Sequence, residues 1–335
     1  MYGFTVESDL PISGLADVFT PAMRPDIRLD LAAIPLWAEQ ALSLAVTSKR
    51  TRPAAYFPGD SSFTVSEFAH RHYFELTYGD GTRFLMDCGA TQIWGEPGPG
   101  LSHEDLCVYL LGPVMGFVLR QRGMTALHAS GVAFQERAIA LLGAAGAGKS
   151  TTAAALALRG LPVLCEDVCA LRETAGQFQV LPAYPRICLW PDSVEFLFSS
   201  RECLPIIVAG WGKRFLPLDG KRARFASVAM PMAAVFLFSD RSDADSAPAI
   251  EPISQRDALL QLVQNTYMNW YLDPRQRADE FDVLTRLVSS VECFRVVPSS
   301  DPARLNNLAE LIERTIMKVS PMTPAATLGA APRNV

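Results

Sequence analysis

Residues 143–150 read Gly-Ala-Ala-Gly-Ala-Gly-Lys-Ser and match the phosphate-binding loop pattern GxxxxGK[ST] at every required position. Glycines let backbone N–H groups turn inward around phosphate oxygens, and the N-terminus of the following helix adds partial positive charge. Lys149 would supply charge to the β- and γ-phosphates, and Ser150 a hydroxyl ligand for Mg²⁺. The sequence therefore predicts ATP and Mg²⁺ as ligands, with the nucleotide held by Gly143, Ala144, Ala145, Gly146, Ala147, Gly148, Lys149, Ser150 and Thr151.

An acidic pair and a histidine flank this loop. Glu166-Asp167 ends an apolar run, with Asp167 18 positions after Lys149, and His128 lies 21 positions before Lys149. A carboxylate facing the γ-phosphate would take the proton of an incoming hydroxyl as a general base. A histidine nearby would orient that base or stabilise charge on the transferring group. Taken singly, each feature also fits a plainer interpretation, a solvated strand end or a satisfied core histidine.

The elements that must position these residues have the pattern of an α/β core. Apolar strands are predicted at 129–134, 138–142 and 161–165, and an Ala-rich helix at 151–159. The loop then lies where its chemistry needs it, between a strand and a helix. We expect strand 161–165 to return beside strand 138–142, which would bring Glu166-Asp167 toward the γ-phosphate.

The first hundred residues have a different pattern. Tyr73–Tyr78 and Arg83–Met86, separated by Gly-Asp-Gly-Thr, predict a β-hairpin. Pro97-Gly98-Pro99-Gly100 interrupts the strands, and Ser102 is a suitable N-cap for an apolar helix running toward Arg122. We therefore predict a β-rich N-terminal domain at 1–100, a kinase domain with a leading helix at 101–319, and a flexible Pro- and Ala-rich tail at 320–335.

Composition narrows the class of protein. The 335 residues carry a formal net charge of −5 without a basic stripe, which argues against nucleic acid as a partner. Seven scattered cysteines without CxxC pairs indicate reduced thiols, and the N-terminus has no secretion signal, so we expect a cytoplasmic protein. The apolar stretch 106–119 is shorter than the roughly 20 residues that a bilayer crossing needs, so a buried helix is predicted and no membrane partner.

Together, His128, the loop ending in Lys149-Ser150, and Asp167 resemble the HPr kinase/phosphorylase family in order and spacing, over residues 127–171. The resemblance implies that His128 is an active-site histidine, Lys149 the loop lysine, Ser150 a magnesium ligand and Asp167 the acid/base residue. It also implies a mixed-sheet P-loop core of the kind shared with phosphoenolpyruvate carboxykinase.

Beyond residue 171 the chain departs from that family. The family's Glu-containing signature EIRGLGI and its Gly-Arg-Asn-Leu motif have no counterpart here, whereas residues 184–192 and 212–215 look like the shortened relatives found beside lasso peptide biosynthesis enzymes. Those relatives phosphorylate the C-terminal serine of the precursor peptide. Arg186 and Arg214 then become candidates for binding phosphate or a peptide carboxylate, and Glu166 and Asp192 for holding magnesium beside Ser150. Residues 265–267, Asn-Thr-Tyr, also look like this subgroup.

We therefore predict an ATP-dependent serine kinase acting on a peptide or small protein, with the C-terminal serine of a lasso peptide precursor as its substrate. Two alternatives stay open: HPr kinase/phosphorylase itself, and an ATP-binding regulatory switch. A switch would need an apolar strand ending in a magnesium acid, for which residues 233–240, ending in Asp240, are a candidate. The resemblance also leaves a homo-oligomer open.

Overall fold

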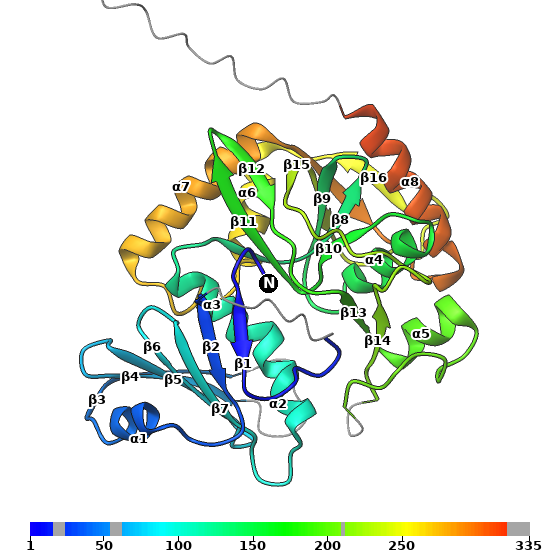
Figure 1. Cartoon of the computed structure of the whole chain (residues 1–335). Helices are drawn as coiled ribbons and strands as arrows, with labels where there is room; N and C mark the ends of the chain where they lie inside the picture. The colour runs from blue at the N-terminus through cyan, green and yellow to red at the C-terminus, as the bar shows by residue number, and fades with distance from the viewer. Residues whose placement is uncertain (16–23, 54–61, 209–211, 320–335) are drawn as a thin grey trace, which may run out of the picture.

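The computed structural model describes residues 1–15, 24–53, 62–208 and 212–319. Two large sheets, with helices packed between and around them, make up the molecule (Figure 1). The prediction of a mixed α/β fold is confirmed, because both sheets contain parallel and antiparallel pairs. The predicted tail at 320–335 lies outside the described residues.

The first sheet contains the strands of the N-terminal region in the order β1-β2-β7-β6-β5-β4-β3. Strands β5 and β6 form the predicted hairpin, with Tyr73 opposite Asp87. Side chains of β5 alternate between buried and partly exposed, as in a half-buried sheet, whereas the middle of β6 is buried on both faces. The bounds are β1 Val6–Ser8, β2 Ile27–Asp30, β3 Val46–Pro53, β4 Ser62–Phe68, β5 Tyr73–Tyr78, β6 Arg83–Asp87 and β7 Gln92–Glu96, with helix α1 at Leu36–Leu42.

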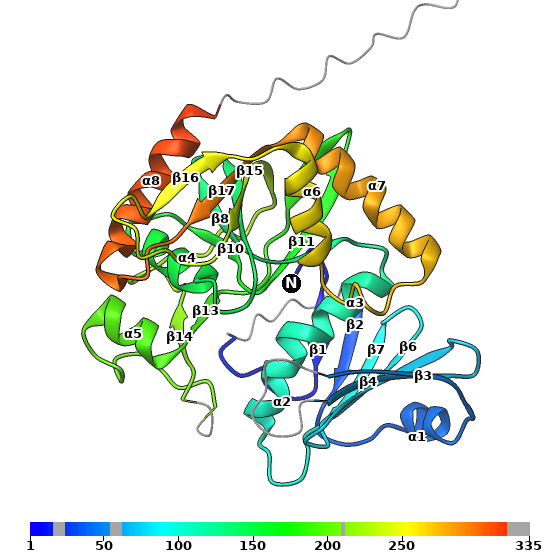
Figure 2. The ribbon, with the colours of Figure 1, turned by 180° about the vertical axis from the view of Figure 1, so that it is seen from behind.

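A helical run leads from the first sheet to the second. Ser102 caps α2 (His103–Tyr109) in a capping box with Asp105, as a helix start here requires. The run continues through a π-helical turn, η1 (Leu110–Val114), into α3 (Met115–Gln121). Figures 1 and 2 both show α2 and α3 between the two sheets. Stretch 106–119 is thus a largely buried helical run inside the protein, with Gly112 and Pro113 in its π-helical turn.

The second sheet has the order β10-β8-β11-β12-β15-β17-β16, with β9 paired to both β8 and β15. Strands β8 and β9 form an antiparallel hairpin, and β9 runs parallel to β15. The bounds are β8 Ala126–Phe134, β9 Arg137–Leu142, β10 Val163–Cys165, β11 Val168–Thr174, β12 Gln177–Val180, β15 Met230–Phe238, β16 Ala249–Pro252 and β17 Glu292–Val297; a separate pair is β13 Arg186–Leu189 with β14 Arg214–Pro217.

One prediction about this sheet was wrong. Strand β10 does not return beside the loop strand β9: it pairs antiparallel with β8, with Val163 opposite Val132. Both edges of β9 are already used, one by its hairpin partner β8 and the other by β15, which comes some ninety residues later in the chain. Glu166 and Asp167 therefore follow a strand that β8 separates from the loop strand β9.

Helices cover both faces of the second sheet. Along β9, Ile139 and Leu141 pack in the core cluster that contains α4 and α8, whereas Ala140 and Leu142 pack in the cluster that contains α3, α6 and α7. This alternation is what a strand buried on both sides produces. The helix bounds are α4 Lys149–Leu158, α5 Pro191–Phe198, α6 Gln255–Gln264, α7 Pro274–Ser290, the 3₁₀ turn η3 Pro302–Arg304 and α8 Leu305–Lys318.

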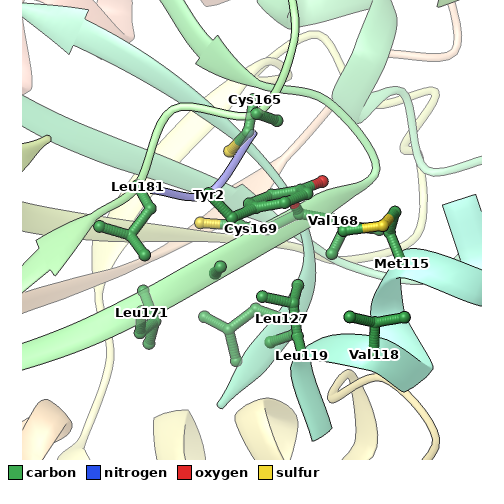
Figure 3. Close-up of a cluster of buried hydrophobic side chains, with 14 of the residues drawn as sticks. Tyr2, Met115, Val118, Leu119, Leu127, Cys165, Val168, Cys169, Leu171 and Leu181 are labelled. Atoms are coloured by element: carbon green, nitrogen blue, oxygen red, sulfur yellow. The ribbon is translucent and has the colours of Figure 1, made fainter. Parts of the chain in front are cut away.

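A single core cluster extends from the first sheet through α3 to the second, joining Phe74, Phe117 and Leu127 among many others. Figure 3 shows part of it, where Tyr2 lies beside Cys165 and Cys169. The division into domains at residue 100 therefore stays a prediction. Of the helices that the structure describes, none combines the length and apolar character that a bilayer crossing demands.

Candidate active site

The loop between β9 and α4 has the backbone that the glycine pattern predicts. Gly146 and Gly148 have φ of +78° and +102°, in the region that glycine adopts without strain. Gly143 lies against Phe238, where an added Cβ would come within 2.9 Å of the Phe238 Cβ. A side chain at any of these positions would strain or displace the loop, so the glycines are required by its shape.

Lys149, the first residue of α4, is 6% exposed. Its Nζ donates to the carbonyl oxygens of Gly143 and Ala144 at 2.8 and 3.0 Å. Burial lowers the pKa of Lys149, and the negative charges of Asp167 and Glu166 act in the opposite direction. The ammonium therefore lies at the loop and within the field of the acidic pair.

Ser150 and Glu166 are joined directly. The Ser150 hydroxyl donates to Glu166 Oε1 at 2.7 Å, and Glu166 is 4% exposed. Burial, followed by the neighbouring Asp167 charge, raises the pKa of Glu166, and Lys213 and Ser150 oppose that shift. A hydroxyl and a carboxylate oxygen in contact at the start of α4 are hard oxygen donors, the type that Mg²⁺ prefers.

Asp167 is held by two donors. His128 Nε2 lies 3.1 Å from Oδ1, and the Tyr267 hydroxyl donates to Oδ2 at 2.5 Å. Burial raises the pKa of Asp167, but the hydrogen bonds from His128 and Tyr267 and the charge of Lys213 outweigh it, so the pKa lies well below its ordinary value. The carboxylate is thus ionised and fixed in orientation, and 34% of its side chain is exposed.

Strand pairing explains how Asp167, His128 and Tyr267 come together. His128 on β8 lies opposite Val168 at the start of β11, which places Asp167 next to it. The segment after α6 pairs with the start of β8: His128 N–H donates to Asn265 O at 2.8 Å, and Tyr267 N–H to Ala126 O at 2.9 Å. A third approach comes from the helical run, since a Cβ on Gly112 would lie 3.3 Å from Asp167 Oδ2.

The two predicted arginines are engaged with the backbone. Arg186 is 2% exposed, and its Nη1 donates to Ser13 O at 2.6 Å. Its guanidinium lies over the Tyr184 ring, and its charge opposes the rise in the pKa of Glu166. Arg214 is half-buried, and its Nη1 donates to Leu204 O at 2.6 Å. Their roles in binding phosphate or a carboxylate stay predictions.

Lys213 is the cation that the sequence interpretation passed over. Its Nζ lies 5.3 Å from the centre of the Trp190 ring. Burial alone would lower its pKa, but Cys188, Glu166 and Asp167 together raise it above the ordinary value, so the ammonium stays charged. The motif Gly-Lys-Arg-Phe drew attention to Arg214, because a guanidinium matches phosphate geometry, but it is the neighbouring lysine whose charge acts on both acids.

Thr151 and Asp192 lie on another side of the loop. The Thr151 hydroxyl is 2.9 Å from that of Ser193 on α5, and Asp192 in the same helix is exposed and accepts a hydrogen bond from Arg201 at 2.9 Å. Within the described residues, no three His, Cys, Asp or Glu side chains come close enough together to hold a metal ion by themselves. Asp192 as a magnesium ligand stays a prediction.

Strand 233–240, the candidate for a switch protein, is β15 and its continuation. It lies directly beside β9 and is buried from Met232 to Phe238. Asp240 is exposed, two residues beyond the strand end. This placement is also that of an ordinary core strand, so its role as a magnesium acid stays a prediction.

Comparisons with known proteins give only distant likenesses, and these are to solved structures. No family model matches the chain, and no curated protein matches it. Among solved structures, the HPr(Ser) kinase/phosphatase from Coxiella burnetii is similar, with 15% sequence identity and a TM-score of 0.31 over 57% of this chain and 93% of that chain. Since so distant a likeness cannot support a function, we infer the function from the site.

Proposed function

We propose that this protein is an ATP-dependent kinase that transfers the γ-phosphate to a serine hydroxyl. The supporting observation is the arrangement around Asp167. An ionised carboxylate, fixed by His128 and Tyr267, lies next in sequence to Glu166, which bonds the first turn of the loop helix at Ser150. A protein that uses ATP only as a switch needs the loop, but it does not need a second carboxylate held for an incoming hydroxyl.

In the proposed reaction the serine oxygen attacks the γ-phosphorus in line with the leaving β–γ bridging oxygen. The new O–P bond forms as the bond to ADP breaks, and the hydroxyl proton passes to Asp167. Each Asp167 oxygen accepts one hydrogen bond in the structure, and an ionised carboxylate offers about four lone-pair sites. The serine hydroxyl can therefore donate to Asp167 without displacing His128 or Tyr267.

The low pKa of Asp167 makes it a weak base, and this suits phosphoryl transfer. The transition state is loose, so the attacking hydroxyl needs orientation more than early deprotonation. His128 and Tyr267 supply that orientation by fixing both oxygens. Lys149, which donates to two loop carbonyls, would exchange these partners for phosphate oxygens when ATP binds.

Ser150 and Glu166 are the residues that would hold magnesium, because they bring two hard oxygen donors into contact at the loop. When bound, Mg²⁺ neutralises the charge of the β- and γ-phosphates. Mg²⁺ takes most of its ligands from phosphates and water, so two oxygens from the protein suffice.

The acceptor that we propose is the C-terminal serine of a lasso peptide precursor, and the fold relationship that we propose is with the HPr kinase and phosphoenolpyruvate carboxykinase type. Both rest on the sequence resemblance around residues 127–171, 184–192 and 212–215. A C-terminal serine carries a carboxylate next to its hydroxyl, so its site needs a cation close to the base. Lys213, whose charge acts on Asp167, meets that need.

To test this function, the protein would be incubated with ATP, Mg²⁺ and either a serine-terminated lasso precursor peptide or HPr, and the mass gain of one phosphate followed by mass spectrometry. We expect phosphate on the terminal serine, and loss of transfer in Asp167→Asn with ATP binding retained. Phosphate on HPr alone would favour HPr kinase/phosphorylase. ATP hydrolysis without transfer to either acceptor would favour a switch and refute the proposal.

A further inference from the structure

A cavity of about 340 Å³ opens beside the loop, and Glu166 is not among the residues that line it. It is bordered by the first turn of α4, by α5, by the segment after β15, and by η3 and the start of α8. Its lining residues include Gly148, Thr151, Ser193, Phe196, Arg241 and Leu305. None of these residues takes part in the proposed transfer step.

The first turn of α4 separates this cavity from the reacting end of the site. Ser150 directs its hydroxyl to Glu166, and the next residue, Thr151, directs its hydroxyl to Ser193 in the cavity wall. Successive residues of an α-helix point about 100° apart, so the two hydroxyls serve different sides of the loop. A phosphate chain lying in the loop thus has its γ end toward Glu166 and its other end toward the cavity.

We propose that this cavity binds the nucleoside of ATP, with Arg241 contacting the phosphate nearest to the ribose. The proposal rests on the kinase function above and adds to it the place of the base and sugar. A volume of about 340 Å³ is at the lower end of the usual range of small-ligand pockets, about 300 to 1,000 Å³. A purine ribonucleoside is a ligand of suitable size.

Arg241 is suited to a phosphate contact. It is exposed, and its Nη2 lies 3.6 Å from where a Cβ on Gly148 would be, so the guanidinium stands over the loop. It makes no hydrogen bond or ion pair with another described residue. Arg304, the other cavity arginine, differs, because its Nη1 donates to the carbonyl oxygens of Asp245 and Ala247. Arg304 holds the wall in place, whereas Arg241 is available to a ligand.

The walls combine apolar and polar groups as a nucleoside requires. Phe196 is 38% exposed at the cavity, and Leu305 and Pro302 add apolar surface on which a base can pack. The hydroxyls of Ser193 and Ser299 offer donors and acceptors for ribose or the base edge. Such a mixture of apolar surface and a few polar groups is typical of small-ligand sites.

The test compares ATP with inorganic tripolyphosphate, which has the phosphates without the nucleoside, by isothermal titration calorimetry on the full-length protein. Ser193→Trp and Leu305→Trp fill the cavity from different walls, and Asn307→Trp, on the exposed face of α8, is the matched control. We expect each filling variant to bind ATP about ten to a hundred times more weakly, the value of one lost base-stacking contact. Tripolyphosphate affinity should be unchanged, and Asn307→Trp should match the wild type.

Arg241→Ala should weaken both ligands, because its contact is to phosphate. Unchanged ATP affinity in both filling variants would overturn the cavity assignment. An equal loss of affinity for ATP and for tripolyphosphate in both variants would overturn it too. A wild-type protein that binds neither ligand would instead refute the kinase proposal, so the two failures are distinguishable. Thermal unfolding of each variant checks that the fold is retained.

Discussion

Tyr267→Phe removes one of the two hydrogen-bond donors that hold Asp167 and leaves the rest of the side chain in place. Burial, followed by the charge of Asp167, raises the pKa of Tyr267 well above its ordinary value, so its hydroxyl keeps its proton and donates. The ring packs against Gly116, and phenylalanine retains that contact. The variant therefore tests whether the 2.5 Å hydrogen bond to Oδ2 keeps Asp167 ionised.

The expected magnitude follows from the type of bond lost. A hydrogen bond to a charged group contributes about 1.5 to 3 kcal/mol. One pKa unit corresponds to about 1.4 kcal/mol, so the pKa of Asp167 should rise by about one to two units in the variant. Because the shift favours the protonated form, Asp167 should become protonated at higher pH in Tyr267→Phe than in the wild type.

The assay is the pH titration of the Asp167 carboxyl carbon by ¹³C NMR at constant ionic strength. An activity profile would not report Asp167, because Glu166, whose pKa is raised, is protonated first as the pH falls. We expect the midpoint of this titration to move upward by about one to two pH units in Tyr267→Phe. The matched control is Tyr271→Phe, which loses a hydrogen bond of the same length to Glu67, between β4 and the segment before α7. A titration midpoint that does not move in Tyr267→Phe, or that moves equally in the control, would refute the reasoning.

Contacts of Glu166, Gly116 and Ser102 can each be tested by a single substitution. Because the pKa of Glu166 is raised in the folded protein, its contribution to stability is complete below the ordinary glutamate pKa and is lost as the pH rises through the folded-state pKa. Glu166→Gln should therefore be more stable than the wild type near pH 7 in urea unfolding. The same variant should lose transfer activity. Gly116→Ala would place a Cβ 2.5 Å from the Tyr267 ring and should cost about 1 to 3 kcal/mol in the same assay and reduce transfer, because it displaces a donor of the site. Ser102→Ala removes the cap that bonds the Asp105 N–H and should cost about 1 kcal/mol with kcat/KM unchanged; a large loss of activity would mean that the start of α2 affects the site.

Local sequence patterns predicted the parts of this structure that local physics decides. The glycine positions of the loop, the hairpin β5–β6 and the Ser102 cap each follow from a backbone conformation or a hydrogen bond that neighbouring residues can satisfy. The juxtaposition of His128 and Asp167 was also anticipated, but from family spacing rather than from the residues alone.

Long-range pairing was the part that the sequence did not reveal. β9 and β15 are similar apolar runs, and nothing within either shows that they are neighbours. Tyr267 reaches Asp167 from 100 positions away because the segment after α6 pairs with β8, and such a pairing leaves no local pattern. Lys213 was missed for a different reason: two adjacent cations are equivalent in sequence, and only the strand pair β13–β14 decides which one acts on the acids.

The π-helical turn at Leu110–Val114 has a consequence for how this protein tolerates insertions and deletions. A π turn holds one residue more than an α turn, and each residue rotates the rest of an α-helix by about 100°. Gly112 in this turn lies close to Asp167, and Gly116, one turn later, packs against the Tyr267 ring. Deleting one residue between the two glycines would restore a regular helix but rotate one glycine relative to the other by about 100°, so both could not keep those partners. The length of this run is therefore as constrained as its composition, and related chains with the same site should keep it.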